Sequence, residues 1–200
     1  MGDKTAPGPQ EQRFAAYIEG LAEAAGHADR HAPLRNYCTG LLLPGERKSV
    51  EPMAARLAGD NVRRMHQSLH HVVADAPWSD EAVLDRCLES VIPGMLRRDP
   101  VVAWVVDDTG FPKKGRESVG VARQYCGQVG KQDNCRVAVS LSVTTEKASM
   151  PVAYRLYLPQ SWIEDRQRRK KTGVPDSIQF QTKPEIALDQ VRRARERGLP

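Results

Sequence analysis

The sequence predicts an α+β protein, with helices in residues 1–99 and a sheet within residues 100–200. Apolar residues between 11 and 98 recur every three or four positions, which is the spacing of amphipathic helices. At Pro100 the pattern changes to segments rich in β-branched residues, and the first of these is Val101–Val106. That run is the longest purely apolar one, and it is far shorter than the roughly 20 residues of a membrane-spanning helix.

The first half is predicted to be a bundle of four or five helices with short connections. Turn and capping residues set the boundaries, because Ser, Asp and Pro are favoured at helix starts and Gly at their ends. The predicted helices begin near Glu11, around residues 34–43, after Ser49, after Asp60 and after Ser79, and Gly26 ends the first.

The second half is predicted to hold one strand, an antiparallel meander and a helix. Val101–Val106 has the composition of a strand buried on both faces, and therefore central in its sheet. The meander is expected over residues 118–127, 135–144 and 151–158, with a turn at 130–134. A last helix begins near Lys183 and ends at Gly198. Such a helix normally leads into another strand, so we expect the chain to stop inside a domain.

Charge is divided unevenly along the chain. Residues 1–100 carry 12 basic and 14 acidic side chains, whereas residues 101–200 carry 18 basic and 11 acidic ones. The segment Arg166–Lys171 alone holds five positive charges in six residues. A half-chain with this charge is expected to attract a polyanion such as nucleic acid. A solvated basic surface without a partner remains the alternative.

Other candidate ligands are weaker. The four cysteines form no CxxC pair, which favours reduced structural thiols over a disulfide framework or a zinc site. His66 and His70 have the spacing of zinc ligands on a helix, but Gln67 stands where a zinc protease would have glutamate. The three tryptophans are interpreted as packing residues. No secretory signal is visible at the start of the sequence.

Asp107 and Asp108 follow the first predicted strand and are the main candidates for catalysis. Ligands bind near the carboxyl ends of strands in open α/β sheets. Successive side chains of a strand point to opposite faces, so one carboxylate at most serves a given site. Capping of the strand end is the structural alternative. An enzyme that transfers phosphoryl groups through an aspartyl nucleophile usually has a second Asp two residues later, where this chain has Gly110. An aspartic protease normally has a small residue after Asp-Thr-Gly, where this chain has Phe111. A two-metal nuclease fits the order strand, Asp, strands, helix.

The chain resembles bacterial insertion-sequence transposases of the DDE superfamily endonuclease type, over about residues 35–200. The matching segments are Val106–Gly115 (VDDTGFPKKG), Val119–Gly127 (VGVARQYCG), Gly130-Lys131, Asn134–Val139, Leu156–Pro159, Trp162 and Gly173–Pro175. Shorter matches precede them at Gly40, Arg47–Ser49 and Ala76–Trp78.

The resemblance implies an RNase H-like catalytic domain with an Asp-Asp-Glu triad that holds Mg²⁺ or Mn²⁺. Its first member is Asp108, directly before Thr109, with Asp107 beside it. The second Asp is expected on a strand after the last helix and the Glu much later, so residues 100–200 form only the first part of such a domain. The implied activity is metal-dependent DNA cleavage and strand transfer. The chain alone is expected to be inactive.

The resemblance also implies partners and a location. Element-end and target DNA are expected, with a second copy or a full-length transposase as further partners, in the bacterial cytoplasm near the nucleoid and with no membrane contact. Residues 1–99 are expected to recognise element ends. The predicted DNA contacts are Lys113, Lys114, Arg116, Arg123, Lys131, Arg168, Arg169, Lys170 and Lys171. The alternative is a non-catalytic DNA-binding or dimerising fragment, either an inhibitor or a remnant.

Overall fold

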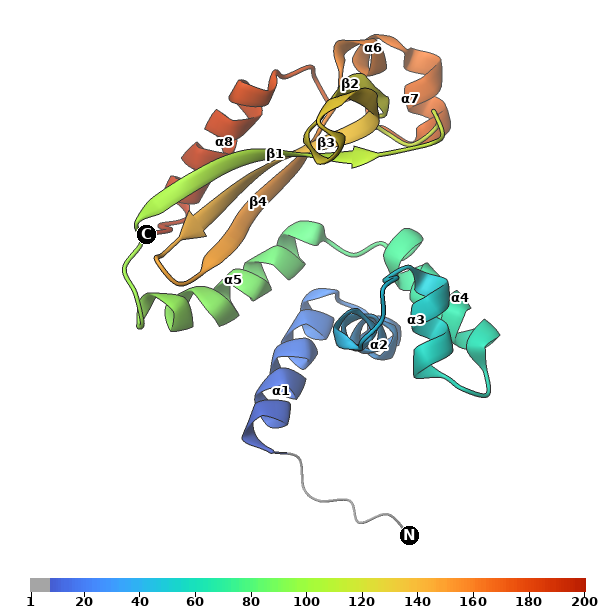
Figure 1. Ribbon diagram of the computed structural model, residues 1–200, viewed down its shortest axis with the longest axis vertical. Helices are drawn as coiled ribbons and strands as arrows, with labels where there is room; N and C mark the ends of the chain where they lie inside the picture. The colour runs from blue at the N-terminus through green and yellow to red at the C-terminus, as the bar shows by residue number, and fades with distance from the viewer. Residues whose placement is uncertain (1–7) are drawn as a thin grey trace. The chain divides into compact units, whose positions relative to one another are not determined.

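The computed structural model describes residues 8–200 and has the predicted α+β composition (Figure 1). The chain divides into two compact units, residues 1–91 and 92–200, and the division falls within α5 (Asp80–Leu96). We call them the helical unit and the sheet unit. None of the helices in residues 8–200 combines the length and apolar character needed to cross a membrane.

The helical unit contains the predicted series of helices. They are α1 (Pro9–Ala24), the 3₁₀ turn η1 (Ala28–Arg30), α2 (His31–Leu42), α3 (Val50–Leu57), α4 (Val62–Ala74) and α5. Ser49 lies at the N-cap of α3, as predicted. The predicted cap of α4 was wrong by one residue: Asn61 replaces Asp60, because the Asn61 side chain accepts a hydrogen bond from the backbone N–H of Arg64.

Two small cores hold these helices together. The first joins α1, α2 and α4 through residues such as Ile18, Ala22 and Val72. The second joins α3 to α4 through Met53 and Leu69, with residues of α2 packed beside it. Burial of these side chains fixes which face of each helix remains outside.

The sheet unit contains four strands in antiparallel pairs. They are β1 (Ala103–Pro112), β2 (Ala122–Cys126), β3 (Lys131–Thr144) and β4 (Ser149–Tyr157), with the 3₁₀ turn η2 (Gly127–Val129) after β2. The meander is confirmed, but its first turn lies at 127–130 and not at 130–134, because β3 already begins at Lys131. Strand β3 rather than β1 is the central strand. The prediction that Val101–Val106 is buried on both faces was wrong: β1 pairs only with β3 among the described residues, and Val105 and Val106 are exposed.

Gly110 has a steric role in β1. A Cβ atom at this position would lie 2.8 Å from Cys126 Sγ and 3.0 Å from Cys126 Cα. Real Cβ contacts are essentially never this short, so the close approach of the end of β2 to β1 requires glycine. Gly110, the last residue of the Asp-Asp-Thr-Gly sequence, is therefore required for the packing of β2 against β1.

Three helices follow the sheet: α6 (Gln160–Glu164), α7 (Arg166–Thr172) and α8 (Lys183–Glu196). Helix α8 lies along one face of the sheet (Figure 1) and covers the buried side of β3, where Val137, Val139 and Leu141 are almost inaccessible. A capping box between Thr182 and Glu185 begins α8. Gly198 follows the helix with a positive φ, which agrees with the predicted helix end.

Candidate functional site

The register of β1 separates the two candidate carboxylates. Asp108 lies opposite Val139, and Asp107 lies opposite Ser140. Directly opposed residues of antiparallel strands share a face, so Asp108 lies on the side covered by α8 and Asp107 on the other side. Thr109 lies on the same face of the sheet as Asp107. The sheet therefore brings one carboxylate of the pair, that of Asp108, to the α8 side.

Lys183 is the direct partner of Asp108. Its Nζ lies 2.6 Å from Asp108 Oδ2 and 5.7 Å from the centre of the Tyr157 ring. The Asp108 side chain is 44% exposed and that of Lys183 is 32% exposed, so both groups remain in contact with water. The pair joins the first helical turn of α8 to the middle of β1 across 75 positions of sequence.

Sequence reasoning missed Lys183 as a site residue. A cation in the first turn of a helix is disfavoured by the helix dipole, which is positive at that end. That placement is a usable signal, because a lysine there needs a compensating anion. Which anion it meets depends on how α8 packs against the sheet, and no local pattern reports this.

A second charged group lies beside this pair on the same face of the sheet. Arg155 lies opposite Val139 on the β4 side, so it lies in one row with Asp108. Its guanidinium donates to Gln181 Oε1 at 2.8 Å and lies 3.6 Å from Asp189 Oδ2. These residues line a cavity of about 620 Å³ that also includes the segment 172–179.

The basic loop after β1 is held against α7. The side-chain amide of Asn134 donates to the carbonyl oxygens of Lys113 and Gly115, at 2.5 and 2.9 Å. Arg168 of α7 donates to the carbonyl oxygen of Arg116. These contacts place two basic segments side by side, although they lie about 50 positions apart in sequence.

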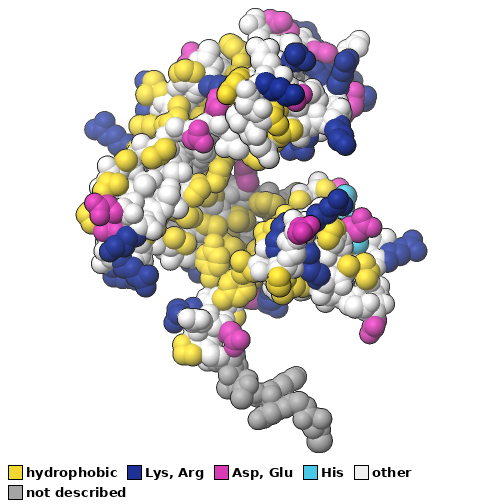
Figure 2. Space-filling model, viewed as in Figure 1, with side chains coloured by type: hydrophobic (Ala, Val, Ile, Leu, Met, Phe, Trp, Pro, Cys, Tyr) yellow, Lys and Arg dark blue, Asp and Glu magenta, His cyan; other side chains and the backbone are white. Residues whose placement is uncertain are grey.

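An ion pair also joins the loop to α7. Lys171 Nζ lies 2.8 Å from Glu117 Oε2, and this hydrogen bond lowers the pKa of the Glu117 carboxyl. Lys and Arg side chains gather at the end of the sheet unit that carries α7 (Figure 2). Lys114, Arg116 and Lys170 are exposed there, and Lys113 is partly exposed.

The other predicted DNA contacts fall into two groups. Arg123 of β2 and Lys131 of β3 are exposed on the hairpin beside this loop. Arg169 must be taken out of the set. It is 7% exposed, and its guanidinium donates to the carbonyl oxygens of Ile163, Pro175 and Ile178. A basic residue used in this way fastens the chain between α6 and α8 and cannot reach a phosphate.

Trp162 explains the position of Arg168. The Trp162 ring is fully buried, as expected of a packing residue, and its Nε1 donates to the carbonyl oxygen of Val121 at 2.7 Å. The Arg168 guanidinium lies 3.7 Å from the ring centre. Cation–π contact at this distance orients the arginine while part of it remains exposed.

Residues 8–200 do not form a complete metal site. No group of three or more His, Cys, Asp or Glu side chains is placed to hold an ion within that range. Asp108 is a partly exposed carboxylate whose partner is the ammonium group of Lys183. His66 and His70 stack on one another with ring centres 6.2 Å apart, and no third ligand joins them among the described residues.

The buried cysteines are not part of the site. All four cysteines are free, as the spacing predicts. Burial raises the pKa of the Cys135 thiol to about 11, and neighbouring Cys126 adds to the effect. A thiol with this pKa is protonated at neutral pH and a poor nucleophile.

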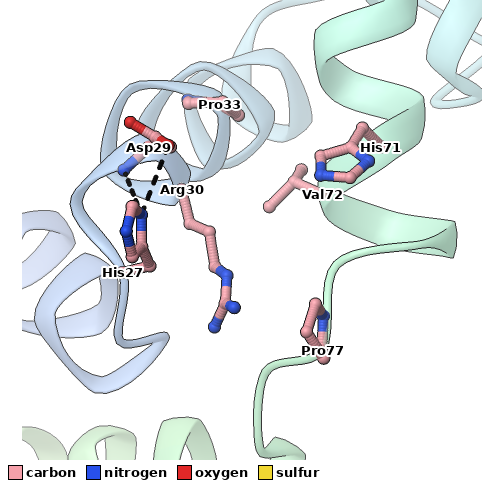
Figure 3. Close-up of a pocket in the computed structure, with 7 residues that line it drawn as sticks. All are labelled: His27, Asp29, Arg30, Pro33, His71, Val72 and Pro77. Atoms are coloured by element: carbon pink, nitrogen blue, oxygen red, sulfur yellow. Dashed lines mark hydrogen bonds and ion pairs between the residues drawn. The ribbon is translucent and has the colours of Figure 1, made fainter.

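The helical unit has a small cavity of about 160 Å³ between η1 and α4 (Figure 3). His27 and His71 lie at opposite sides of it, and Val72 and Pro77 form its apolar part. His27 is held by Asp29, and Arg30 donates to the carbonyl oxygen of Ala25 at 2.7 Å. These polar groups already have protein partners, so the cavity is a gap in packing between helices.

An antiparallel sheet with one helix-covered face, an exposed carboxylate on that face and a basic flank are the features expected of a nucleic-acid enzyme. Comparison with known proteins supports this class. The family model for the DDE superfamily endonuclease matches residues 20–200, and the chain belongs to this family.

A similar protein is a probable transposase for insertion sequence element IS701 from Microchaete diplosiphon. The two are 30% identical over 154 residues, which cover 77% of this chain and 36% of that protein. The chain thus spans about a third of the length of this curated relative. No solved structure matches the chain. The predicted family, an insertion-sequence transposase of the DDE type, is confirmed.

Proposed function

We propose that this chain provides the DNA-binding surface and the first catalytic carboxylate of a transposase. The reaction would be cleavage of DNA strands at the ends of an insertion sequence, followed by attack of the freed 3′-hydroxyl on target DNA. The observation that supports this assignment is the placement of Asp108 on the α8 face of β1, five residues before the basic loop.

In this proposal Asp108 is the first ligand of a divalent-metal site, which takes Mg²⁺ or Mn²⁺. Such ions activate water and stabilise the leaving oxygen in phosphodiester cleavage. The other ligands would come from carboxylates that residues 8–200 do not bring to this face. Lys183 would compensate the charge of Asp108 until the site is complete.

The basic residues would bind the DNA backbone on both sides of the cleaved bond. Lys113 and Lys114 are nearest to Asp108 in sequence, and the bond from Arg168 to Arg116 adds α7 to the same surface. Arg123, Lys131 and Lys170 extend it. The expected partners are element-end and target DNA, with a second copy or a full-length transposase remaining a prediction, and the bacterial cytoplasm as the site of action.

The test uses the purified 200-residue chain and supercoiled plasmid carrying the element ends, with Mg²⁺ or Mn²⁺. We expect DNA binding without nicking, because one ligand position cannot hold two ions. Metal-dependent nicking that is lost in Asp108→Ala would overturn the view that this chain is inactive alone. In the complete transposase, Asp108→Asn is expected to abolish cleavage while DNA binding persists, and unchanged cleavage would overturn the role of Asp108.

The same assays test the alternative function. A non-catalytic fragment would bind DNA, or pair with the complete transposase, and reduce its activity in mixtures. Inhibition by the 200-residue chain at concentrations where it covers the DNA would support that role beside the proposed one.

A further inference from the structure

Helices α3 and α4 are consecutive helices that pack against each other and are joined by a short turn. Four residues, 58–61, join the end of α3 to the start of α4. The turn is fixed at both ends: the N–H of Asn61 donates to the carbonyl oxygen of Ala58 at 3.0 Å, and the Asn61 side chain caps α4. DNA-binding helix-turn-helix motifs join their two helices by a turn of three to four residues.

The core between these helices determines which side of α4 faces outward. Met65 and Leu69 face the core shared with α3, and Val72 faces the core shared with α1 and α2. Leu69 and Val72 are fully buried. Gly40 allows α2 to approach closely, since a Cβ there would lie 3.1 Å from Met53 Sδ. A third helix thus supports the pair from behind, which is how a recognition helix is held rigid.

The outward side of α4 carries a row of hydrogen-bonding side chains. Arg63, Arg64, Gln67, His70 and His71 are exposed and follow one another at helical spacing. Within residues 8–200, neither Arg63 nor Arg64 has a side-chain partner.

The charge on α4 is of one sign. Its thirteen residues include no Asp or Glu. The acidic residues that flank it in sequence are Asp60 in the turn and Asp75 at its end, and Asp75 is in contact with His70 and His71. The first two turns of α4 therefore present uncompensated positive charge, whereas the helical unit as a whole does not.

We propose that α4 is a recognition helix that reads base edges in the major groove of double-helical DNA. Arginine pairs with the O6 and N7 atoms of guanine, and glutamine with the N6 and N7 atoms of adenine. Arg63, Arg64 and Gln67 lie in the first two turns, which is the part of a recognition helix that contacts bases. This deepens the expectation that residues 1–99 recognise element ends, because it names the helix and the side chains that would read the sequence. It does not depend on the proposed catalytic role of Asp108.

The experiment selects bound molecules from a library of random 30-base-pair duplexes with the purified chain. We expect enrichment of one sequence motif that contains guanine. Arg64→Ala and Gln67→Ala are each expected to lose discrimination at one position by roughly 5- to 150-fold, the effect of one bidentate base contact. Methylation of guanine N7 in the motif should block binding, since this atom lies in the major groove.

Two variants separate base reading from charge alone. Arg13→Ala removes one exposed positive charge from α1 in the same unit, and it should leave the motif unchanged. Arg64→Lys keeps the charge but removes the planar fork, so it should lose discrimination while the salt dependence of binding is kept.

The outcomes distinguish this proposal from the catalytic one. A motif that persists in Arg64→Ala and Gln67→Ala, or no enriched motif with the wild-type chain, would overturn it. Failure of the complete transposase to cleave DNA would not affect the selection. Normal thermal unfolding of the variants is the check that their effect is on recognition, because all these side chains are exposed.

Discussion

Helix α4 carries two arginines and helix α7 carries three, yet they leave very different amounts of that charge available to a ligand. On α4 both guanidiniums extend into solvent without a side-chain partner among the described residues. On α7, Arg169 is buried against backbone carbonyls, Arg168 lies over Trp162, and Lys171 is held by Glu117. A basic run in a sequence therefore overstates the charge that a helix offers to DNA.

The difference arises from what surrounds each helix. Only the apolar side of helix α4 packs against the core, so its polar side remains exposed to solvent. Helix α7 has seven residues and no apolar stripe, so its attachment depends on its charged side chains. The predictions below test this contrast, from the largest expected effect to the smallest.

Trp162→Ala is expected to have the largest effect, because it empties the buried centre to which α7 is attached. Replacement of a buried tryptophan by alanine typically costs about 3–5 kcal/mol. The loss should appear as faster hydrogen exchange of amides in the sheet unit. Tyr154→Ala is the matched aromatic control, since Tyr154 is exposed, and equal losses in both variants would contradict the prediction.

Arg169→Met keeps the aliphatic part of the side chain and removes the guanidinium. Three carbonyl groups then lose their donor, and we expect a loss of about 2–4 kcal/mol in the free energy of unfolding of the sheet unit. Lys170→Met changes the neighbouring exposed residue in the same way and should stay within about 0.5 kcal/mol. If Arg169→Met kept full stability but weakened DNA binding, the phosphate-contact interpretation of Arg169 would be restored.

These two residues show where sequence reasoning succeeded and where it could not. The burial of Trp162 follows from residue type, and the strands and helices follow from periodicity and capping, as at Ser49 and Gly198. The burial of Arg169 could not be predicted from the sequence, because Arg168, Arg169 and Lys170 are three consecutive basic residues that no local pattern distinguishes. Only the folded path of the chain brings the carbonyl oxygens of Ile163, Pro175 and Ile178 together around one of them.

The candidate site shows the same division. The preceding strand singled out Asp107 and Asp108 together, and the resemblance to transposases selected Asp108. Their separation onto opposite faces follows from strand geometry. The exposure of Val105 and Val106 within residues 8–200 was not predicted, because an apolar run reports composition and not the strands that pair with it. Lys183 was missed because its contact with Asp108 spans 75 positions.

The loop after β1 should account for a measurable part of the DNA affinity. If Lys113 and Lys114 each neutralise one phosphate, Lys113→Ala with Lys114→Ala should reduce the slope of log affinity against log salt by roughly 1.8. Fluorescence anisotropy with a random-sequence duplex measures it. Arg192→Ala with Arg195→Ala on exposed positions of α8 removes the same charge outside the proposed surface. An equal change in both pairs would show that only net charge matters.

Helix α4 should tolerate the loss of its arginines. Arg63→Ala and Arg64→Ala remove exposed side chains without partners, so each is expected to change the free energy of unfolding by less than about 0.5 kcal/mol. Urea unfolding of the helical unit checks this against Leu69→Ala, which empties a buried position of the same helix and should cost about 2–5 kcal/mol. A loss above 1 kcal/mol for either arginine would mean that α4 resembles α7 after all.

The smallest effect concerns the ion pair that holds Lys171. The hydrogen bond from Lys171 lowers the pKa of the Glu117 carboxyl below its ordinary value of about 4.3. Because the folded-state pKa is the lower one, the bond contributes above the ordinary value and is lost as pH falls through the folded-state pKa.

In Lys171→Ala, therefore, the pKa of Glu117 should rise towards its ordinary value in a carboxyl NMR titration. Glu185 is the internal control, because the backbone N–H of Thr182 lowers its pKa and the substitution leaves that bond intact. A pKa of Glu117 that does not move would show that Lys171 is free in solution. Both Lys170 and Lys171 of helix α7 would then be available to DNA. The difference between α4 and α7 in available positive charge would be correspondingly smaller.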